Sequence, residues 1–207
     1  MEQFNILLTS AGFNDINNYV SDENREMFKN ISKNKLVVII ANAAPEGTGN
    51  FIARENVKQN FISVGAKKVD VLDLNNSNID ELLNYNIIYA LGGNITHLIE
   101  LVHKTKFKDI LVDFLKKGIY IGESAGSMIL CDDLKWAYEL KRGTKKKYDV
   151  ILDTYKGLNI TEYRIFPHFN KASDEMKEKI KNFEENNNIQ ITRLNDGEII
   201  KINYIKE

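Results

Sequence analysis

Short apolar runs alternate with longer stretches of helical periodicity along the first 120 or so residues, and few folds accommodate this alternation. Strand character is found in Asn5–Thr9, Lys35–Ala41, Lys68–Leu72, Asn86–Leu91 and Gly118–Gly122. Helical spacing of apolar residues is found in Asp22–Ile31, Ile52–Val64, Thr96–Lys104 and Lys108–Lys117. Several strands are continuous apolar runs, which is typical of strands covered on both faces. The pattern predicts an α/β fold, a three-layer α/β/α sandwich with a mainly parallel central sheet.

The last part of the chain is less regular. It contains a short strand at Arg164–Pro167 and a polar helix at Ser173–Glu185. A terminal pair of strands follows, Ile189–Leu194 and Glu198–Tyr204, and Asn195-Asp196-Gly197 between them is typical of a hairpin turn. No internal repeat or proline-rich linker divides the sequence, so we expect a single domain over residues 1–207.

Charge and composition exclude several classes of partner. Lys plus Arg number 28 and Asp plus Glu number 29, so no global field attracts nucleic acid or an anionic membrane. Neither a signal peptide nor an apolar run of membrane-spanning length is visible. Cys131 is the only cysteine, which is compatible with a reducing compartment. We expect a soluble cytoplasmic protein without nucleic-acid or membrane partners, and a homodimer remains open.

Gly122-Glu123-Ser124-Ala125-Gly126 lies where a strand ends and a helix is expected to begin. Gly-x-Ser-x-Gly at such a turn is typical of a nucleophile elbow, which needs small residues because strand and helix backbones pass close together. The backbone N–H of Ala125 would then lie at a helix N-terminus and help to stabilise an oxyanion. The alternative is a small-residue turn, since such a string arises by chance in roughly one chain in ten of this length.

A serine nucleophile needs a base, usually histidine, and only three histidines are present. His97 and His103 lie within or beside the helix that begins near Thr96. His168 follows Pro167, which would stop a strand and fix the chain just before the imidazole. Placement therefore favours His168 over His97, although an isolated loop histidine is more often exposed and idle. His97 and His103 are not spaced as a helical metal pair, and we expect neither a metal nor a cofactor.

Three segments together carry a family resemblance. Leu91-Gly92-Gly93-Asn94, Gly122–Gly126 and Pro167-His168-Phe169 resemble, in order and spacing, those of the aspartyl dipeptidase (dipeptidase E) family of serine peptidases, which also includes cyanophycinase. The resemblance covers nearly the whole chain. It implies a fold like that of class I glutamine amidotransferases, with Ser where those enzymes place Cys. It also implies hydrolysis of short peptides, among them dipeptides with an N-terminal Asp, through an acyl-enzyme.

The resemblance assigns the catalytic groups residue by residue. Ser124 becomes the nucleophile and His168 the general base, with an oxyanion hole made by the backbone N–H groups of Ala125 and of the Gly92-Gly93 turn. The acidic member of the triad falls on Glu139, where the family has Asp. The alternatives for this acid are Asp132, Asp133 and Asp153.

Further residues are candidates for contact with a peptide substrate. Arg164, close to His168, and the basic run Lys141–Lys147 are alternative cations for a substrate carboxylate, although such a run is more often a solvated loop. Glu123 either contacts a substrate ammonium or is a solvated residue on the turn. Asn94 is expected to bind substrate from the Gly-Gly-Asn segment.

Two other functions compete with a serine peptidase. An esterase of the α/β-hydrolase type shares the order Ser–acid–His, but the 44 positions between Ser124 and His168 leave little room for the extra strands of that fold. A catalytically silent ligand-binding member of the amidotransferase-like fold would use Ser124 only as a small turn residue. Glutamine amidotransfer itself is disfavoured, because it depends on a thiolate.

Overall fold

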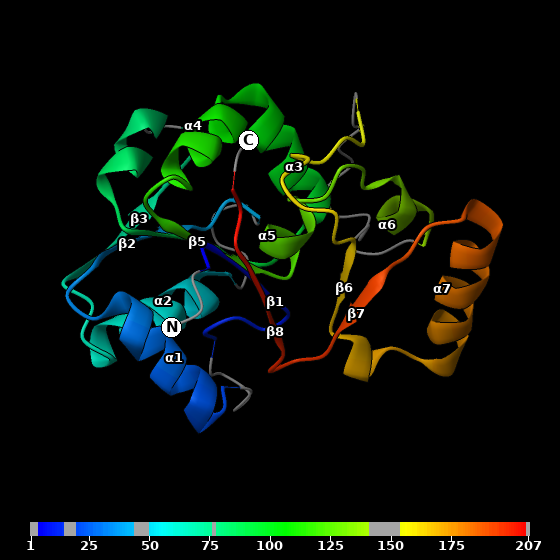
Figure 1. Ribbon diagram of the computed structural model, residues 1–207, viewed down its shortest axis with the longest axis horizontal. Coiled ribbons are helices and arrows are strands. Elements are labelled where there is room, and N and C mark those ends of the chain that lie inside the picture. Colours follow the sequence, from blue (N-terminus) through cyan, green and yellow to red (C-terminus); the bar gives the residue numbers. More distant parts are fainter. Residues whose placement is uncertain (1–3, 15–19, 44–49, 76–77, 141–153, 206–207) are drawn as a thin grey trace.

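The computed structural model of the protein describes residues 4–14, 20–43, 50–75, 78–140 and 154–205. Its centre is a six-stranded sheet with the strand order β3-β2-β4-β5-β1-β8 (Figure 1). The strands are β1 (Ile6–Thr9), β2 (Leu36–Ile40), β3 (Lys68–Leu72), β4 (Ile87–Ala90), β5 (Ile119–Glu123) and β8 (Ile199–Ile202). The first five pair in parallel, and β8 joins β1 antiparallel. The predicted mainly parallel sheet is confirmed.

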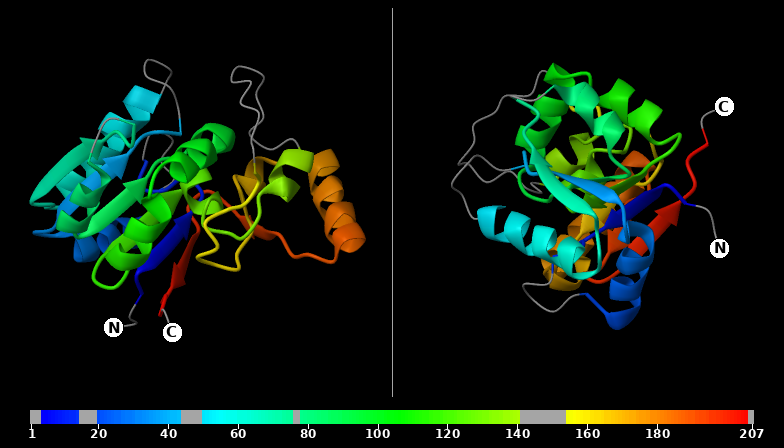
Figure 2. Two further views of the ribbon diagram at one scale, coloured as in Figure 1. Left: turned by 90° about the horizontal axis from the view of Figure 1, so that it is seen from above. Right: turned by 90° about the vertical axis from the view of Figure 1, so that its left-hand side faces the viewer.

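Helices cover both faces of this sheet (Figure 2). The longer ones are α1 (Asp22–Ser32), α2 (Asn50–Ser63), α3 (Ile95–Lys104) and α4 (Phe107–Phe114). Phe28 of α1 and Phe61 of α2 pack in one apolar cluster, whereas Leu98 of α3 and Leu111 of α4 belong to the cluster on the other face. The three-layer arrangement is therefore confirmed. In the described part of the chain, no helix combines the length and apolar character needed to cross a membrane.

Further elements, most of them short, complete the sandwich and extend it on one side. They are η1 (Ile79–Asn84), α5 (Ala125–Met128), α6 (Lys135–Glu139), η2 (Phe169–Lys171) and α7 (Asp174–Asn187). A second, two-stranded sheet pairs β6 (Ile165–Pro167) with β7 (Thr192–Leu194) in parallel, next to α7 (Figure 1). The hydroxyl of Ser173 caps α7 by accepting from the backbone N–H of Met176 (3.2 Å).

The predicted C-terminal hairpin is wrong. β7 pairs with β6, and β8 pairs with β1, so the chain passes from the small sheet to the large one between them. Asn195-Asp196-Gly197 still turns the chain, with the N–H of Glu198 donating to the carbonyl of Asn195 (3.0 Å). A hairpin signal reports only on the turn, and here the free edge of β1 offers the last strand a longer partner.

This crossing places the residues after β6 and β7 at one point. Parallel strands end at the same edge, and Pro167 lies opposite Leu194 in the small sheet. In the large sheet, Thr9 lies opposite Ile199. The residues that follow Thr9, Pro167 and Leu194 therefore meet at the carboxyl end of the parallel strands, where open α/β sheets carry their sites.

Candidate active site

Ser124 stands at a strained turn between β5 and α5. Its backbone has φ 48° and ψ −106°, which non-glycine residues rarely adopt and which occurs chiefly where function requires it. The N–H of Ser124 donates to the carbonyl of Thr9 on β1 (3.0 Å), so the turn is tied to the neighbouring strand. The side chain is half-buried, whereas the residues on either side of it are buried. This geometry is that of a nucleophile elbow.

The two glycines of the motif are required by close backbone packing. A Cβ atom on Gly126 would lie 2.2 Å from the carbonyl oxygen of Ala90. A Cβ atom on Gly122 would lie 2.6 Å from the backbone nitrogen of Ser127. Both distances are far below van der Waals contact, so neither position accepts a side chain without movement of β4, β5 or α5.

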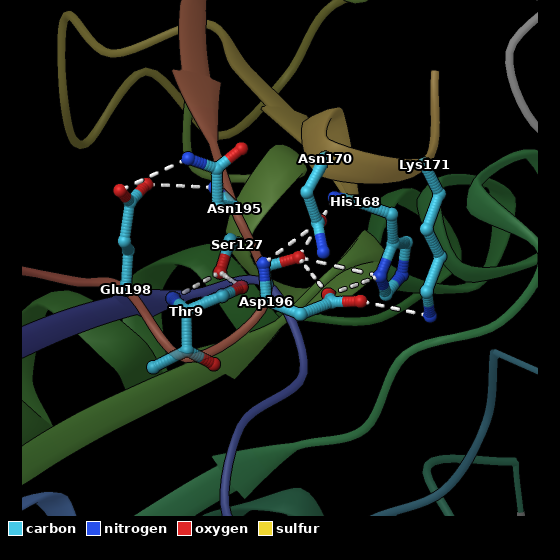
Figure 3. A network of polar contacts seen from close by, with 9 residues as sticks. Thr9, Ser127, His168, Asn170, Lys171, Asn195, Asp196 and Glu198 are labelled. Atoms are coloured by element: carbon cyan, nitrogen blue, oxygen red, sulfur yellow. Dashed lines mark hydrogen bonds and ion pairs between the residues drawn. The ribbon is translucent and has the colours of Figure 1, made fainter. Parts of the chain in front are cut away.

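Ser127 fixes the elbow to β1 from inside the protein. Its buried hydroxyl accepts from the N–H of Thr9 (2.9 Å) and lies 2.8 Å from the Thr9 carbonyl oxygen (Figure 3). The same hydroxyl lies 2.7 Å from the carbonyl oxygen of Gly122. The hydroxyl of Thr9 also donates to Gly122 (2.6 Å). Ser127 is therefore structural, and Ser124, which is half-buried, is the more accessible of the two hydroxyls.

His168 projects from the end of β6 in a left-handed backbone conformation, with φ 56° and ψ 35°. Its N–H donates to the hydroxyl oxygen of Ser10 (2.7 Å), just beyond β1. Its Nδ1 lies 2.5 Å from Oδ1 of Asp196 (Figure 3). Because Asp196 accepts the proton on Nδ1, the neutral imidazole presents an unprotonated Nε2.

The side chain of Asp196 is closed off from solvent. Its Oδ1 accepts from the Ser10 hydroxyl (2.6 Å), and Nζ of Lys171 lies 2.8 Å from its Oδ2 (Figure 3). Burial by itself would raise the pKa of this carboxyl. Lys171, then Ser10 and His168, outweigh burial and hold the pKa below its usual value, so the carboxylate is ionised at neutral pH.

Ser124 and His168 are both held by the end of β1. Thr9 accepts from the N–H of Ser124, and Ser10, the next residue, accepts from the N–H of His168. Consecutive residues of one chain thus carry the elbow and the imidazole. Both groups therefore lie at the carboxyl edge of the sheet.

The structure brings Asp196 to His168, and Glu139 stands elsewhere. Glu139 ends the short helix α6, is exposed, and pairs with Lys135 (3.6 Å). Asp132 pairs with Arg164 (2.5 Å), and the carboxylate of Asp133 accepts from the N–H of Lys135 at the start of α6. The remaining alternative, Asp153, lies outside the described residues. The carboxylate nearest to the imidazole belongs to a segment at the far end of the chain, so a fixed spacing after the serine does not locate it.

The Gly92-Gly93 turn lies against the elbow. A Cβ atom on Gly92 would be 3.0 Å from Cβ of Ser124. Gly93 has φ 146°, and a Cβ atom there would be 2.5 Å from the carbonyl oxygen of Ala43. The positive φ and the backbone contact require glycine at position 93, whereas a Cβ atom at position 92 would need its neighbours to shift by a few tenths of an ångström. The turn therefore packs directly against Ser124, and its role in an oxyanion hole stays a prediction.

Glu123 is neither solvated nor turned toward solvent: only 8% of it is exposed. The Tyr89 hydroxyl donates to its Oε2 (2.6 Å), and the backbone N–H of Gly92 and the side chain of Asn14 also donate to it. Full burial is the largest influence on this carboxyl and raises its pKa to about 7, against those three hydrogen bonds. The nearby charge of Asp196 raises the pKa further. The alternative of a solvated turn residue is therefore wrong, and the predicted contact with a substrate ammonium stays a prediction for a carboxylate that already accepts from Tyr89, Gly92 and Asn14.

The other predicted contact residues have structural partners. Asn94 caps α3, where its side-chain oxygen accepts from the N–H of His97 (3.1 Å). Arg164 immediately precedes β6 and His168 immediately follows it, so the two residues are roughly 13 Å apart at the usual rise per strand residue. His103 places Nε2 2.7 Å from the carbonyl oxygen of Lys156. The basic run Lys141–Lys147 lies outside the described residues.

Three residues of the site have no local sequence signal. Ser10 and Asp196 contact His168, and Lys171 contacts Asp196. Ser10 and Asp196 come to the imidazole because β6 pairs with β7 and β8 pairs with β1. The Asn-Asp-Gly turn is visible in the sequence, but a hairpin turn would leave its aspartate in solvent. Knowing the two strand pairings would have been sufficient to place Asp196 beside His168.

The fold and the strained serine elbow are those of a serine hydrolase with an α/β/α architecture. The chain belongs to peptidase family S51, whose family profile matches residues 6–205. The protein is therefore a serine peptidase, and neither the esterase nor the silent binding protein is favoured.

Individual relatives agree with this assignment. The chain is 27% identical over 190 residues to Peptidase E of Nostoc sp. (strain PCC 7120), covering 86% of this chain and 74% of that protein. It is 29% identical over 109 residues to an uncharacterized peptidase of Listeria monocytogenes, covering 50% of this chain and 52% of the relative.

Solved structures share the fold. A putative peptidase E protein of Listeria monocytogenes superposes with a TM-score of 0.71 at 24% identity, over 97% of this chain and 95% of that one. A peptidase from an acI-B1 Actinobacterium gives a TM-score of 0.59 at 21% identity, over 84% and 74% of the two chains. At these identities the superpositions establish the architecture.

Proposed function

We propose that this serine peptidase hydrolyses short peptides through an acyl-enzyme on Ser124, with His168 as general base and Asp196 as the group that orients it. The hydrogen bond between His168 Nδ1 and Asp196 Oδ1 (2.5 Å) carries the proposal. It selects the tautomer in which Nε2 can accept a proton from the serine hydroxyl. Without that bond, the strained elbow would present a hydroxyl of ordinary, weak nucleophilicity.

The reaction follows from this geometry. His168 takes the hydroxyl proton as the Ser124 oxygen attacks the scissile carbonyl carbon, and it then protonates the departing amine. Water attacks the resulting ester, again with His168 as base, and releases the acyl product. The imidazolium that forms in each step is stabilised by Asp196, whose lowered pKa keeps it ionised. The N–H of Ala125 and the Gly92-Gly93 turn supply donors for the oxyanion.

The proposed substrate class rests on family membership and on a resemblance that covers nearly the whole chain. Dipeptides with an N-terminal Asp are the substrates that the resemblance implies. Their side-chain carboxylate needs a cation, and Arg164 is an unfavourable one, because it is paired with Asp132 and stands at the other end of β6 from His168. The basic run Lys141–Lys147 therefore remains the candidate cation for this carboxylate.

The experiment is a panel of matched dipeptides, Asp-X, Asn-X and Ala-X, in which only the N-terminal side chain changes. Free amino acid release is measured for the wild type, Ser124→Ala and His168→Ala. We expect Asp-X to be cleaved best and both variants to lose activity by at least about 10³-fold. Circular dichroism shows whether each variant keeps the fold.

The outcomes separate substrate from mechanism. Cleavage of Ala-X or Asn-X in preference to Asp-X would remove the acidic specificity and leave the peptidase mechanism in place. An Ser124→Ala variant as active as the wild type on any dipeptide would rule out the mechanism.

A further inference from the structure

Glu123 is a buried acid beside the nucleophile for which the triad has no use. It is the last residue of β5 and immediately precedes Ser124. Because successive strand side chains point to opposite faces, a carboxylate here turns away from the serine hydroxyl and into the protein. Charged side chains are almost never this buried unless other groups compensate them. The contacts of Glu123 should therefore reveal what it holds.

The carboxylate joins three segments at the carboxyl end of the sheet. Its Oε2 accepts from the hydroxyl of Tyr89 on β4 (2.6 Å), and that hydroxyl itself accepts from the N–H of Phe13 after β1 (2.8 Å). Its other contacts are with the side chain of Asn14 and the backbone N–H of Gly92. The segment after β1 packs closely against this pair, since a Cβ atom on Gly12 would be 1.9 Å from the Tyr89 hydroxyl.

The contact with Gly92 bears on the oxyanion. An N–H held by a buried carboxylate is not available to a developing negative charge. The N–H of Asn94, two residues on, donates to the carbonyl of Ala43 (2.5 Å). Within the described residues, Gly93 is the donor of this turn without an acceptor, and together with Ala125 on the elbow it is left to face the oxyanion.

We propose that Glu123 is a positioning residue: its ionised carboxylate holds the Gly92-Gly93 turn so that the N–H of Gly93 points at the oxyanion formed on the substrate. This inference rests on the proposed acyl-enzyme mechanism at Ser124. It assigns one donor of the oxyanion hole and the group that orients that donor. Glu123 itself touches neither the substrate nor the reacting atoms.

The charge state of Glu123 decides whether it can accept from all three of its hydrogen-bond donors. A carboxylate accepts from all of them, whereas a protonated carboxyl must donate one hydrogen bond of its own. Its pKa of about 7, raised by burial, makes this change occur in the neutral range. The titratable and charged groups that act on it are Tyr89 from β4 and Asp196 from the turn between β7 and β8. Deprotonation of Glu123 should therefore be a second requirement for activity, besides that of His168.

The test uses Glu123→Gln and Tyr89→Phe. In Glu123→Gln, an amide NH₂ replaces one oxygen and faces a donor, either the hydroxyl of Tyr89 or the N–H of Gly92. The matched controls are Asp70→Asn and Tyr85→Phe, which alter a second tyrosine–carboxylate pair (2.8 Å) away from the catalytic residues. The readouts are kcat and KM for a cleaved dipeptide, and the rate of fluorophosphonate labelling of Ser124 between pH 5 and pH 9.

We expect Glu123→Gln to lower kcat by about 10- to 100-fold with KM within about twofold, since a misdirected donor costs less than a missing one. Tyr89→Phe lowers kcat by less, and the two controls do not change it. As the pH falls, the labelling rate of Ser124 should decrease with two protonations in the wild type, those of His168 and Glu123, and with one in Glu123→Gln. A purely structural role would not remove one ionisation from the profile.

Three results would overturn the inference: an unchanged kcat in Glu123→Gln, a rise in KM alone, or an acid limb with the same number of ionisations in both proteins. If Glu123→Gln fails to fold, the wild-type profile and Tyr89→Phe still decide, because a single-ionisation limb in the wild type contradicts the proposal. Failure of the wild type to react with any dipeptide or fluorophosphonate would instead refute the acyl-enzyme mechanism.

Discussion

The site contains two buried carboxylates, Asp196 and Glu123, with opposite electrostatic surroundings. Asp196 contacts His168 and has the ammonium of Lys171 2.8 Å away. Glu123 precedes the nucleophile, and its described hydrogen-bond donors are neutral: the hydroxyl of Tyr89, the side chain of Asn14 and a backbone N–H. The pKa of Asp196 is lowered, whereas that of Glu123 is raised to about 7.

This difference shows which influence decides the charge of a buried acid. Burial raises the pKa of both groups, and both receive hydrogen bonds that lower it. Asp196 has in addition the cation Lys171, and the imidazole of His168 when it is protonated. In the proposed roles, the acid that orients the base is thus accompanied by a cation, whereas the acid that holds the Gly92-Gly93 turn is not and becomes ionised only in the neutral range.

The largest effect is expected when a substitution removes the charge of Asp196. Asp196→Asn lowers kcat/KM by about 10³–10⁴-fold, because the amide no longer favours the tautomer of His168 that has a free Nε2. Glu139→Gln, which alters an exposed ion pair with Lys135, leaves kcat/KM within about twofold. Steady-state kinetics on one cleaved dipeptide, with circular dichroism of each variant, measures both. The reverse ranking would restore Glu139 as the triad acid.

Glu123 should make the protein less stable at higher pH. Its pKa is about 7 in the folded protein against 4.5 for an unperturbed glutamate, so its contribution is complete below pH 4.5 and lost as the pH rises through 7. Glu123→Gln lacks this loss. Relative to the wild type, we expect the variant to gain roughly 2 to 3 kcal/mol of unfolding free energy between pH 5 and pH 8, measured by urea denaturation.

Asp70→Asn is the control for this stability measurement. The pKa of Asp70 is lowered: burial would raise it, but Lys68 and Tyr85 outweigh burial. Its titration therefore lies below pH 4, and the difference between Asp70→Asn and the wild type should be the same at pH 5 and pH 8. A pH-dependent difference as large as that of Glu123→Gln would show that the raised pKa of Glu123 is not the cause.

The smallest effect is expected when a substitution removes Lys171, the cation that pairs with Asp196. Lys171→Met lets the pKa of Asp196 rise. The lowered pKa stabilises the folded protein above pH 3.8, so the variant loses part of this stability at neutral pH. The difference between variant and wild type disappears as the pH falls through the pKa of Asp196 in the folded protein. Lys171 is half exposed, so solvent screening limits the loss at pH 7 to no more than about 1 kcal/mol. Urea denaturation at pH 7 and pH 4 measures the change. Lys177→Met, which breaks an exposed pair with Asp174, should change stability negligibly at either pH.

The sequence predicted the part of the site that depends on local patterns. Continuous apolar runs located the parallel strands, and Gly122-Glu123-Ser124-Ala125-Gly126 located the elbow because its glycines answer a local steric need. His168 was found by its place after Pro167. Each of these signals lies within a few residues of the feature that it predicts.

Long-range pairing accounts for what the sequence did not reveal. The strand Ile199–Ile202 carries no mark that it pairs with β1, and Asn195-Asp196-Gly197 locally favours a hairpin. Asp196 is about 28 residues from His168 in sequence and reaches it only across two sheets. The burial of Glu123 is likewise set by Tyr89 on another strand. The positions of Asp196 and Glu123 are therefore set by the order in which the strands pair, which local sequence patterns do not reveal.

Fluorophosphonate labelling of the wild type, followed by mass spectrometry of the peptide that contains Ser124, tests the central claim most directly, because it needs no knowledge of the substrate. We predict one adduct per chain, located on Ser124, absent from Ser124→Ala, and formed far more slowly in His168→Ala and Asp196→Asn. No adduct, or an adduct on Ser10 or Ser127 in its place, would contradict the assignment of Ser124 as the nucleophile.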